Sequence, residues 1–528
     1  MRAPKQALRS VKVRLFLVCW IVYSAFFATN VVREHYPAFA LIDRGDWVCD
    51  RYEGMHWDLF RHTDGHVYSG NNVLGSLIAV PVLFVFDPLL DALEERSKAQ
   101  LAASGGEIDT SYDTKYPLRQ AMFRKVKLAG LDLRFGASTA ITSAFLMAPL
   151  SALLVVWMYA TLVARKIAES RAAWLALLFA FATPVFYRSA HLNHNVFLMA
   201  ALFGAFLLLW RKPGESEPLS VARRAGAGFL CGVAIALDYA GVIPAAVLAL
   251  YALSSRARTG GVGAALRESV PSLVAAIPPV LFLLGTQWAM YGDPFTPGQF
   301  VMPRQNEYVD IGARGIAFPS PEIFLKNLVS PSWGLVPFAP LLLFALVPPS
   351  GAREDERVLP RAERRWTWML ALASLAFCAM NVYSLLQFNT GFRYLLPLVP
   401  FLFLLASDAL ARLERRWLAA LTVAVFAHSA VLSMTREVSD TENDLRKAAL
   451  QLGVNACELD GYWTLMLSQT PVPASYVRLV REGPQLPWLT VLHQTSPGAP
   501  WLGSPWLALA LIAATAGSCT LIWRAGRR

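Results

Sequence analysis

The sequence predicts an all-α polytopic membrane protein. Of its 528 residues, 55% are hydrophobic and only 16% are charged, and the mean hydropathy is +0.42. Soluble domains carry about 25% charged residues, so lipid is expected to solvate most of this chain. Apolar runs that approach the roughly 20 residues of a membrane span recur between polar loops, and they predict a bundle of about 12 transmembrane helices.

The first crossing follows an N-terminal segment that contains five basic residues, Arg2, Lys5, Arg9, Lys12 and Arg14. No clear A-x-A cleavage site follows the apolar run, which favours an uncleaved anchor over a signal peptide. The predicted crossings are 15–32, 136–163, 172–188, 194–211, 224–240, 241–255, 269–290, 334–349, 366–386, 393–411, 417–434 and 501–523.

One further apolar segment, 74–90, is shorter and contains Pro81 and Pro88. If it does not cross, six short basic clusters all fall on one side, as the positive-inside rule expects of cytoplasmic loops. If it crosses, all six move outside and only the basic residues of 91–135 move in. The charges therefore predict an interfacial helix, broken by its prolines, that lies along the outer membrane face or dips in and returns. Both chain ends are then cytoplasmic. The clusters are Arg165 to Arg171, Arg211 to Arg224, Arg256 to Arg267, Arg353 to Arg365, Arg412 to Arg416, and Arg524 to Arg528.

The same topology places the three long loops, 33–135, 291–333 and 435–500, on the outer side. The working surface is therefore expected to face away from the cytoplasm and its nucleotide-activated donors. The predicted organisation is a transmembrane domain over 1–434, an extracytoplasmic segment over 435–500, and a last transmembrane helix with a cytoplasmic tail over 501–528. The outer loops are expected to carry juxtamembrane helices.

The net charge of +11 is explained by the basic inner loops. The chain lacks a basic-aromatic platform of the kind that binds nucleic acid, so no nucleic-acid partner is expected. No inner loop contains a glycine-rich phosphate cradle such as G-x-x-x-x-G-K-S/T, which leaves ATP-driven transport without support.

Residues 30–81 contain seven carboxylates and four histidines in an otherwise mostly hydrophobic chain. Glu34 lies just beyond the first predicted helix, and Asp50 and Asp58 follow among Trp, Tyr and His. A carboxylate can orient or deprotonate an acceptor hydroxyl, so Glu34, Asp50 and Asp58 are the candidate catalytic residues. The ordinary alternative for any one of them is a solvated surface acid.

Other polar residues are predicted to lie on the same outer side. His191 and His194 suit contact with a phosphate or an acceptor, although a histidine near a membrane interface is often a hydrogen-bonding cap. Asp238, beside Tyr239, interrupts an apolar stretch where a carboxylate is costly and usually functional or paired. Arg393 suits a phosphate or snorkels to the interface. The histidine pair permits a divalent metal, but without H-E-x-x-H or close Cys/His spacing no metal ligand is assigned.

Two of the six cysteines, Cys49 and Cys457, fall in outer loops. An oxidising compartment would allow them to form a disulfide. Two unpaired cysteines fit the sequence equally well.

A short basic N-terminus, one helix and an acidic aromatic loop lead into D-G-H-V-Y-S-G-N-N-V-L-G-S-L-I-A-V-P at residues 64–81. Further motifs then follow in order: Thr183-Pro184, His194, Asp238-Tyr239, Tyr291-Gly292-Asp293-Pro294-Phe295, Phe318-Pro319-Ser320-Pro321, Ser330-Pro331-Ser332-Trp333-Gly334-Leu335 and Arg393-Tyr394. Together these motifs, which span roughly 30 to 400, resemble bacterial members of the GT-C superfamily. That superfamily includes the protein O-mannosyltransferases and the aminoarabinose transferases that modify lipid A.

The resemblance implies a GT-C-like bundle, a polyprenyl-phosphate-linked sugar donor and a catalytic acid in the first loop. The paired acids usual after the first helix are replaced here by Arg33-Glu34, so the choice among the three candidate acids stays open. The residues expected to bind substrate or phosphate are His194, His191, Arg393, Asp238, Tyr239, His66 and Tyr68.

The sequence thus favours a glycosyltransferase of the bacterial inner membrane, with a cell-envelope glycan, lipid or protein as its acceptor and membrane lipid as a further partner. A membrane transporter or lipid flippase is one alternative. A catalytically inactive GT-C-like scaffold is another. The sequence identifies neither the sugar nor the acceptor.

The topology predicts that a reporter fused near residue 110 is active outside the cytoplasm. Alkaline phosphatase, which folds only there, measures this directly, and a fusion after residue 166 serves as the cytoplasmic control. A cytoplasmic signal at residue 110 would contradict the whole arrangement.

Overall fold

The structure is a computed structural model of the whole chain. It describes every residue except 1–7, 29–30, 57, 107–116, 212–218, 304–310, 350–353, 355–356, 386–390, 436–471, 496–498 and 526–528.

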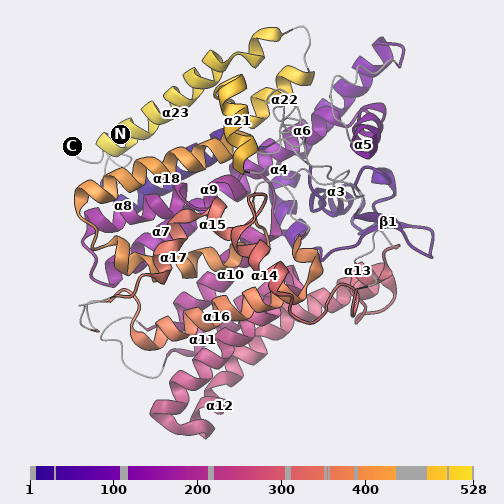
Figure 1. Cartoon of the computed structure of the whole chain (residues 1–528). Helices are drawn as coiled ribbons and strands as arrows, with labels where there is room; N and C mark the ends of the chain where they lie inside the picture. Colours follow the sequence, from indigo (N-terminus) through magenta and orange to yellow (C-terminus); the bar gives the residue numbers. More distant parts are fainter. Residues whose placement is uncertain are drawn as a thin grey trace.

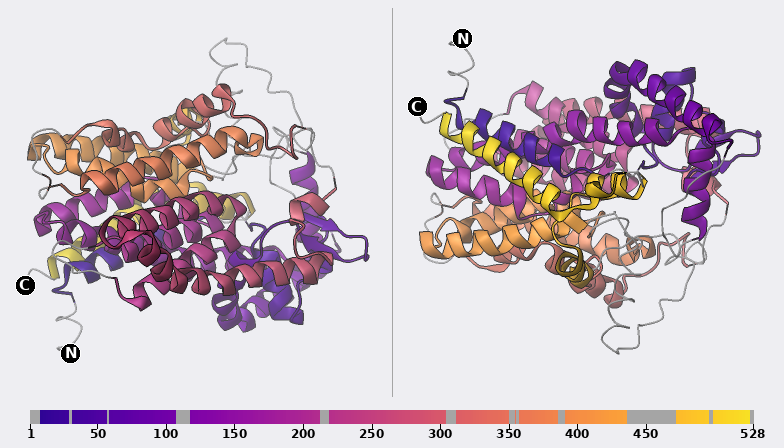
Figure 2. Two further views of the ribbon diagram at one scale, coloured as in Figure 1. Left: turned by 90° about the horizontal axis from the view of Figure 1, so that it is seen from below. Right: turned by 90° about the horizontal axis from the view of Figure 1, so that it is seen from above.

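The long helices run side by side in one bundle (Figure 1). The N- and C-terminal ends lie together at one end of this bundle, as two further views also show (Figure 2). The bundle helices are α2 (Val11–Ala25), α6 (Asp132–Thr142), α7 (Ala148–Ala164), α8 (Glu169–Phe181), α10 (His194–Leu209), α11 (Val221–Leu237), α12 (Val242–Tyr291), α16 (Arg361–Met380), α17 (Val399–Leu410), α18 (Arg415–Thr435) and α23 (Pro505–Ala525).

Shorter elements gather at the opposite end, where α3, α5, β1 and α13 lie in Figure 1. Strands β1 and β2 form an antiparallel hairpin in which Phe60 pairs with Tyr68. The first outer loop contains α3 (His35–Arg44), η1 (Asp50–Tyr52), β1 (Leu59–Arg61), β2 (Val67–Ser69), α4 (Leu74–Ala103) and α5 (Pro117–Leu128). The remaining short elements are α9 (Val185–Arg188), η3 (Tyr239–Gly241), α13 (Gly298–Val301), α14 (Pro321–Val329), α15 (Leu335–Phe338), η5 (Pro340–Leu346), η7 (Val382–Leu385), η8 (Leu396–Leu398), α21 (Val472–Glu482), α22 (Pro487–Thr495) and η9 (Pro500–Gly503).

Five helices in the described part of the chain are long and apolar enough to cross a membrane, judged by length and composition. The predicted count of about twelve crossings is therefore not confirmed. One of the five, Tyr239–Tyr291, contains both predicted segments 241–255 and 269–290. Gly261 interrupts it with a φ of 78°, a left-handed conformation that favours glycine, so α12 consists of two helices joined at a kink.

Prolines explain where other predicted crossings differ from the structure. The segment 334–349 is not a spanning helix but the short α15 followed by the 3-10 helix η5, because Pro337 and Pro340 each lack an amide donor. The segment 172–188 is divided into α8 and α9 at Thr183–Pro184.

The opposite correction applies to 74–90, since α4 continues through Pro81 and Pro88 as one helix of 30 residues. Both prolines lie on its exposed face, where the helix can bend without disturbing its packing against α3 and α6. The prediction that they break the helix is wrong. Its interfacial position stays a prediction, because length and apolar composition also qualify α4 as a span.

Helix α10 lies at the centre of the bundle. Almost every one of its residues is buried, on all faces of the helix. A helix that is apolar all round belongs in the interior, and its sequence, HNVFLMAALFGAFLLL, becomes polar only at the first turn. The polar first turn of α10 therefore lies at the end of the bundle away from the chain termini.

A π-helical turn, η2 (Ser143–Met147), joins α6 to α7. Its wider turn frees backbone carbonyls, and the Trp20 indole of α2 donates to the Ala144 carbonyl at 2.6 Å. Ser143 donates to the Ala190 carbonyl at 2.7 Å, which ties this turn to the segment before α10. Such turns occur often near functional sites.

Cys49 is a free, fully buried thiol. Burial raises its pKa to about 12, so the thiol stays protonated at neutral pH. Cys457, the partner considered from the sequence, lies outside the described residues.

Arg134 of α6 binds α3 and α4 through a buried ion-pair network. Its guanidinium is 1% exposed, and its Nη1 lies 2.6 Å from Asp91 and 3.1 Å from Glu94. Its Nη2 lies 3.0 Å from Asp43 and 3.2 Å from Asp87. One cation therefore holds carboxylates from two other helices.

Arg134→Met is expected to lower the free energy of unfolding by about 3–5 kcal/mol, because it removes the buried cation shared by four carboxylates. Arg51 and Lys98 still pair with Asp43 and Glu94, but Asp87 and Asp91 lose the ion pair with Arg134. Thermal unfolding of the purified protein measures the change. Arg96→Met on the exposed side of α4 is the matched control and should change little. Equal melting temperatures for the two variants would contradict this role for Arg134.

Candidate active site

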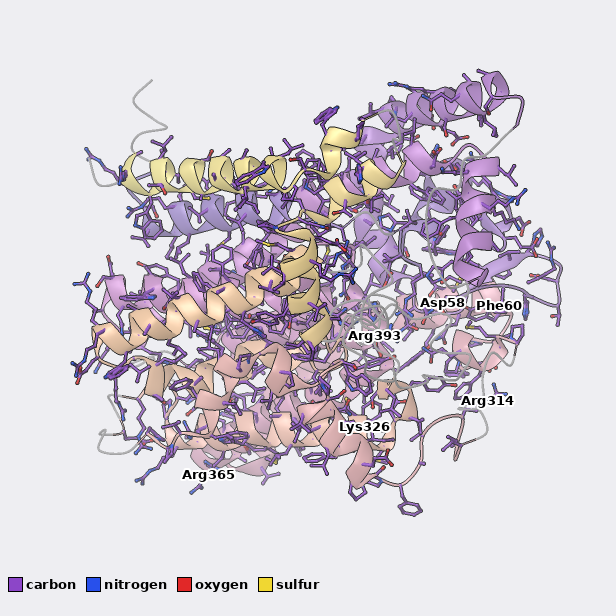
Figure 3. The ribbon with its side chains drawn as sticks, turned by 45° about the horizontal axis from the view of Figure 1, so that its top comes forward. Asp58, Phe60, Arg314, Lys326, Arg365 and Arg393 are labelled. Atoms are coloured by element: carbon purple, nitrogen blue, oxygen red, sulfur yellow. The ribbon has the colours of Figure 1, made fainter. Side chains whose placement is uncertain are left out.

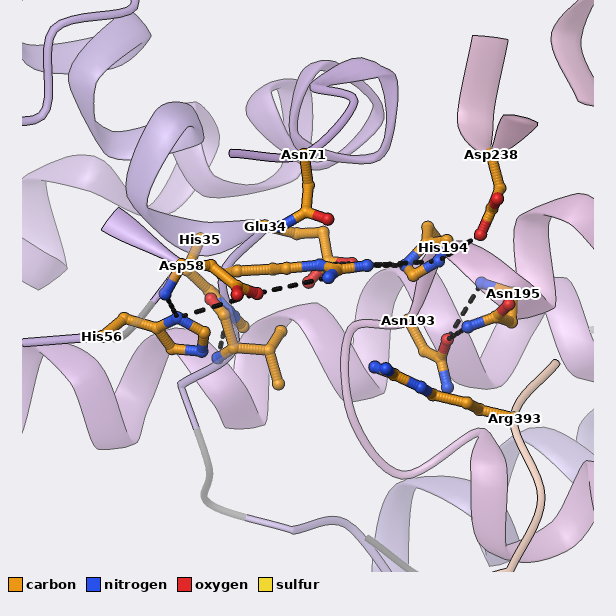
Figure 4. A network of polar contacts seen from close by, with 12 residues as sticks. Glu34, His35, His56, Asp58, Asn71, Asn193, His194, Asn195, Asp238 and Arg393 are labelled. Atoms are coloured by element: carbon orange, nitrogen blue, oxygen red, sulfur yellow. Dashed lines mark hydrogen bonds and ion pairs between the residues drawn. The ribbon is translucent and has the colours of Figure 1, made fainter. Parts of the chain in front are cut away.

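A group of ionisable side chains meets at the end of the bundle that lies away from the chain termini (Figure 4). The members come from the connection after α2, the first outer loop, the start of α10, the end of α11 and the segment before η8. We call them the charged cluster, which consists of Arg33, Glu34, Asp58, His194, Asp238 and Arg393.

Local capping places two of these residues. The Asn193 side chain accepts from the Asn195 amide at 2.9 Å, so α10 begins at His194. Asp238 ends α11 and accepts from the Ala240 amide at 2.9 Å, which starts η3. Both polar side chains therefore sit at helix ends.

Helix α4 packs directly on the cluster through Gly75. A Cβ placed there would lie 3.4 Å from side-chain atoms of both Glu34 and His194. A larger side chain at residue 75 would therefore push against the two residues that form the shortest contact of the cluster. Glycine permits this close approach.

His194 lies between two carboxylates. Its Nδ1 is 2.6 Å from Glu34 Oε1, and its Nε2 is 3.3 Å from Asp238 Oδ2. The Nη2 of Arg33 lies 3.3 Å from both ring nitrogens. The imidazole is consequently held in one orientation from both sides.

Arg33 joins Glu34 to Asp58. Its Nε lies 3.4 Å from Glu34 Oε1, and its Nη1 lies 3.2 Å from Asp58 Oδ2. Burial by itself lowers the pKa of Arg33, but the charges of the two carboxylates raise it above its ordinary value. Arg33 is therefore a permanent cation at the centre of the cluster.

Glu34 is ionised at neutral pH. Burial by itself raises its pKa, but the charge of Arg33 and the hydrogen bond from His194 outweigh burial and hold the pKa well below its usual range. A carboxylate so strongly stabilised in its charged form is a weak base.

Asp58 is more accessible than Glu34, with 14% of its side chain exposed against 6%. Its backbone amide donates to His56 Nδ1 at 3.0 Å. Burial lowers the pKa of His56, which is therefore neutral at pH 7.

Arg393 approaches the cluster from the far side, as Figure 4 shows below His194 and Asn193. Its Nη2 donates to the Tyr394 hydroxyl at 2.7 Å, and its guanidinium lies 4.6 Å from the centre of that ring. The charges of Asp58 and Asp238 act on it electrostatically. Two guanidinium groups, from Arg33 and Arg393, thus share the cluster.

The structure does not bring Asp50, His66 and Tyr68 into the charged cluster. Asp50 accepts from the Val67 amide at 2.6 Å and lies 2.9 Å from His66 Nδ1, so it fastens η1 to β2. Tyr68 donates to Asp64 at 3.0 Å. These contacts belong to the hairpin.

His191 and Tyr239 flank the cluster in sequence. His191 is 2% exposed. Tyr239 follows Asp238, and its hydroxyl accepts from Gln287 of α12. The histidine that contacts both Glu34 and Asp238 is His194.

Sequence reasoning missed Arg33 as a member of the site. Its only signal was its position next to Glu34, directly after the first helix. His56 was also missed, since four histidines share that loop and only one approaches Asp58.

In the described ranges, no group of three or more His, Cys, Asp or Glu side chains is arranged to hold a metal ion. Within the cluster, the position between Glu34 and Asp58 is taken by the Arg33 guanidinium. The donor set there suits a phosphate anion or an acceptor hydroxyl better than a cation.

No protein-family model and no curated protein matches this sequence. Among solved structures, the chain is similar to ArnT from Cupriavidus metallidurans bound to undecaprenyl phosphate, with a TM-score of 0.47 and 16% identity over 98% of this chain and 76% of that one. The apo form of the same protein gives a TM-score of 0.44 and 15% identity over 97% and 74%.

Glu34→Gln should make the protein less stable at neutral pH, and the deficit should depend on pH. A pKa that folding lowers adds stability that is complete above the unfolded pKa, about 4.3, and is lost as pH falls toward the folded pKa. The gap in melting temperature between wild type and E34Q is therefore expected to shrink below about pH 4.

Thermal unfolding across this pH range measures the gap. Glu95→Gln is the control, because Glu95 is exposed on α4 and pairs with Lys98 at the surface. A gap for E34Q that is absent at pH 7, or that is the same at every pH, would contradict the ion pairing described for Glu34.

Proposed function

We propose that this chain is a GT-C-like membrane glycosyltransferase that transfers a sugar from a polyprenyl-phosphate donor to an acceptor outside the cytoplasm. The observation that carries the proposal is the charged cluster, in which Arg33 pairs with Glu34 and Asp58, and His194 lies between Glu34 and Asp238. Arg393 lies beside this cluster (Figure 4). The ordered motifs from the first outer loop to Arg393-Tyr394 support the same function. The proposed location is the bacterial inner membrane.

Arg393 and Arg33 would bind the phosphate of the donor. A guanidinium group forms paired, charge-assisted hydrogen bonds with phosphate oxygens. As the bond between the sugar carbon and the phosphate oxygen breaks, negative charge grows on the departing phosphate. Fixed cations in a site with little water stabilise that charge most in the transition state.

Asp58 is the proposed base. The acceptor hydroxyl would pass its proton to this carboxylate as its oxygen bonds to the sugar carbon and the polyprenyl phosphate departs. Glu34 is less suited, because Arg33 and His194 both stabilise its ionised form. Asp50 is less suited, because both of its oxygens hold the hairpin.

His194 is proposed to orient the reactants rather than to transfer the proton itself. Glu34 and Asp238 fix its ring from opposite sides. A ring held in this way can present the same face to the sugar or phosphate in each cycle. The surrounding apolar helix ends would accommodate the polyprenyl tail.

Asp58→Asn is expected to reduce sugar transfer by about 10²- to 10⁴-fold, since an amide cannot accept the proton. Its affinity for undecaprenyl phosphate should stay close to that of wild type. Arg393→Ala should weaken that binding by roughly 10- to 100-fold, because it removes charge-assisted hydrogen bonds. Native mass spectrometry measures the binding, and mass spectrometry of polyprenyl-phosphate-linked sugars that accumulate in cells measures transfer.

Asp50→Asn is the matched control and should retain transfer, because its carboxylate lies outside the charged cluster. Full transfer by D58N together with loss in E34Q would assign the base to Glu34 instead. Movement of a lipid across the membrane without a new glycosidic bond would support a flippase.

A further inference from the structure

The first turns of α16 carry a set of arginines far from the charged cluster. Arg361, Arg364 and Arg365 lie at the beginning of this helix. Figure 3 shows Arg365 on the opposite half of the molecule from Asp58. These residues belong to the side of the bundle for which the charge pattern predicts basic loops.

A hollow of about 820 Å³ lies along this part of α16. It is open to the outside, and all of its lining residues belong to α16. We call it the α16 groove; the residues along it that matter here are Arg361, Arg364, Arg365, Trp368, Met369 and Leu372.

The three arginines are not equivalent. Arg364 is anchored in the protein, because its Nη2 donates to the carbonyls of Ala345 at 3.2 Å and Val347 at 3.4 Å. Its Nη1 lies 3.9 Å from the buried Asp408. Protein carbonyls therefore hold its Nη2, whereas its Nη1 makes no hydrogen bond with the described residues.

Arg361 and Arg365 point outward. Arg361 is 74% exposed at its side chain, and its Nε lies 3.4 Å from the half-exposed Glu354, an ion pair that solvent weakens. Arg365, four residues later on the same face, is exposed and makes no ion pair or hydrogen bond with any residue that the structure describes. An anion at this place would meet two guanidinium groups and, among the described residues, would compete with Glu354 for Arg361.

An apolar track continues from the arginines along the same face of α16. Met369 is 43% exposed and Leu372 is 56% exposed, and Ala376 extends the line by a further turn. With a rise of about 1.5 Å per residue, the path from Arg365 to Ala376 measures roughly 16 Å. That is close to the hydrocarbon thickness of one leaflet, about half of 30 Å.

The charge of the arginines and the length of the apolar track together indicate which ligand the groove binds. A free phosphate would use the arginines but not the apolar track. A zwitterionic lipid would follow the track but carries no net charge for the arginines. We propose that the α16 groove binds one anionic phospholipid, with its phosphate at Arg361 and Arg365 and an acyl chain along Met369 and Leu372. This inference does not depend on the proposed glycosyltransferase activity.

The test compares lipid binding in two double variants. R361A/R365A removes the outward-facing arginines of the groove. R415A/R416A removes two exposed arginines at the start of α18, a matched loss of charge outside the groove. Full-length protein in detergent is titrated with phosphatidylglycerol or phosphatidylcholine, and native mass spectrometry counts the bound lipid. Thermal unfolding without lipid checks that each variant is folded.

Wild type is expected to retain phosphatidylglycerol in preference to phosphatidylcholine. R361A/R365A should bind phosphatidylglycerol roughly 10- to 30-fold more weakly, whereas R415A/R416A should stay within about twofold of wild type. An equal loss in both variants would mean a general attraction to negative surfaces and would overturn the proposal. Equal binding of the two lipids by wild type would overturn it as well, and that result does not require any variant to fold.

Two further ligands test whether the groove recognises a whole lipid or only its headgroup. Glycerophosphoglycerol and inorganic phosphate carry the anionic group without acyl chains, and at millimolar concentration neither should displace phosphatidylglycerol from wild type. Displacement by either one would make the groove a phosphate site and would overturn the role given to Met369 and Leu372.

Discussion

The contact between Glu34 and His194, at 2.6 Å, joins two parts of the chain that are 160 residues apart. An ionised carboxylate can remain buried only if opposite charges and hydrogen bonds replace its water. Arg33, His194 and, through His194, Asp238 provide that replacement. The connection after α2, the start of α10 and the end of α11 must therefore meet at this place. Helix α4 packs against this place at Gly75, where an added Cβ would lie 3.4 Å from Glu34 and His194.

The need to compensate buried charges also explains the ion-pair network around Arg134, but that network has a different role. Arg134 is 1% exposed and gathers carboxylates from α3 and α4. It presents no free face to a ligand, so its effect is to hold the outer elements on the bundle. In the charged cluster Glu34 and Asp238 lie at helix ends, whereas Asp58 directly precedes β1 and retains some exposure. That difference in geometry separates a structural network from a candidate site.

The two ends of the bundle differ in their chemistry. At the end away from the termini, acids and guanidinium groups are interleaved within one buried cluster. At the other end, arginines such as Arg365 remain exposed beside apolar residues of α16. The first arrangement suits a reaction in which charge moves, and the second suits the static binding of an anionic lipid.

The sequence by itself determined the helical membrane class, because composition and apolar runs do not depend on how the helices pack. It also pointed to Glu34, Asp58, His194, Asp238 and Arg393, since charged or polar groups are costly beside long apolar segments. It did not separate Asp50, His66 and Tyr68 from that group, because a hairpin of a few residues decides which side chains turn toward the bundle.

Only the tertiary structure decided that Arg33 links Glu34 to Asp58, and that α4 continues through Pro81 and Pro88. Both depend on contacts between segments far apart in the chain. Residue types and spacing predict which charged or polar groups need a partner, because burial of an unpaired one in apolar surroundings is unfavourable. The folded chain alone decides which partner compensates each of them.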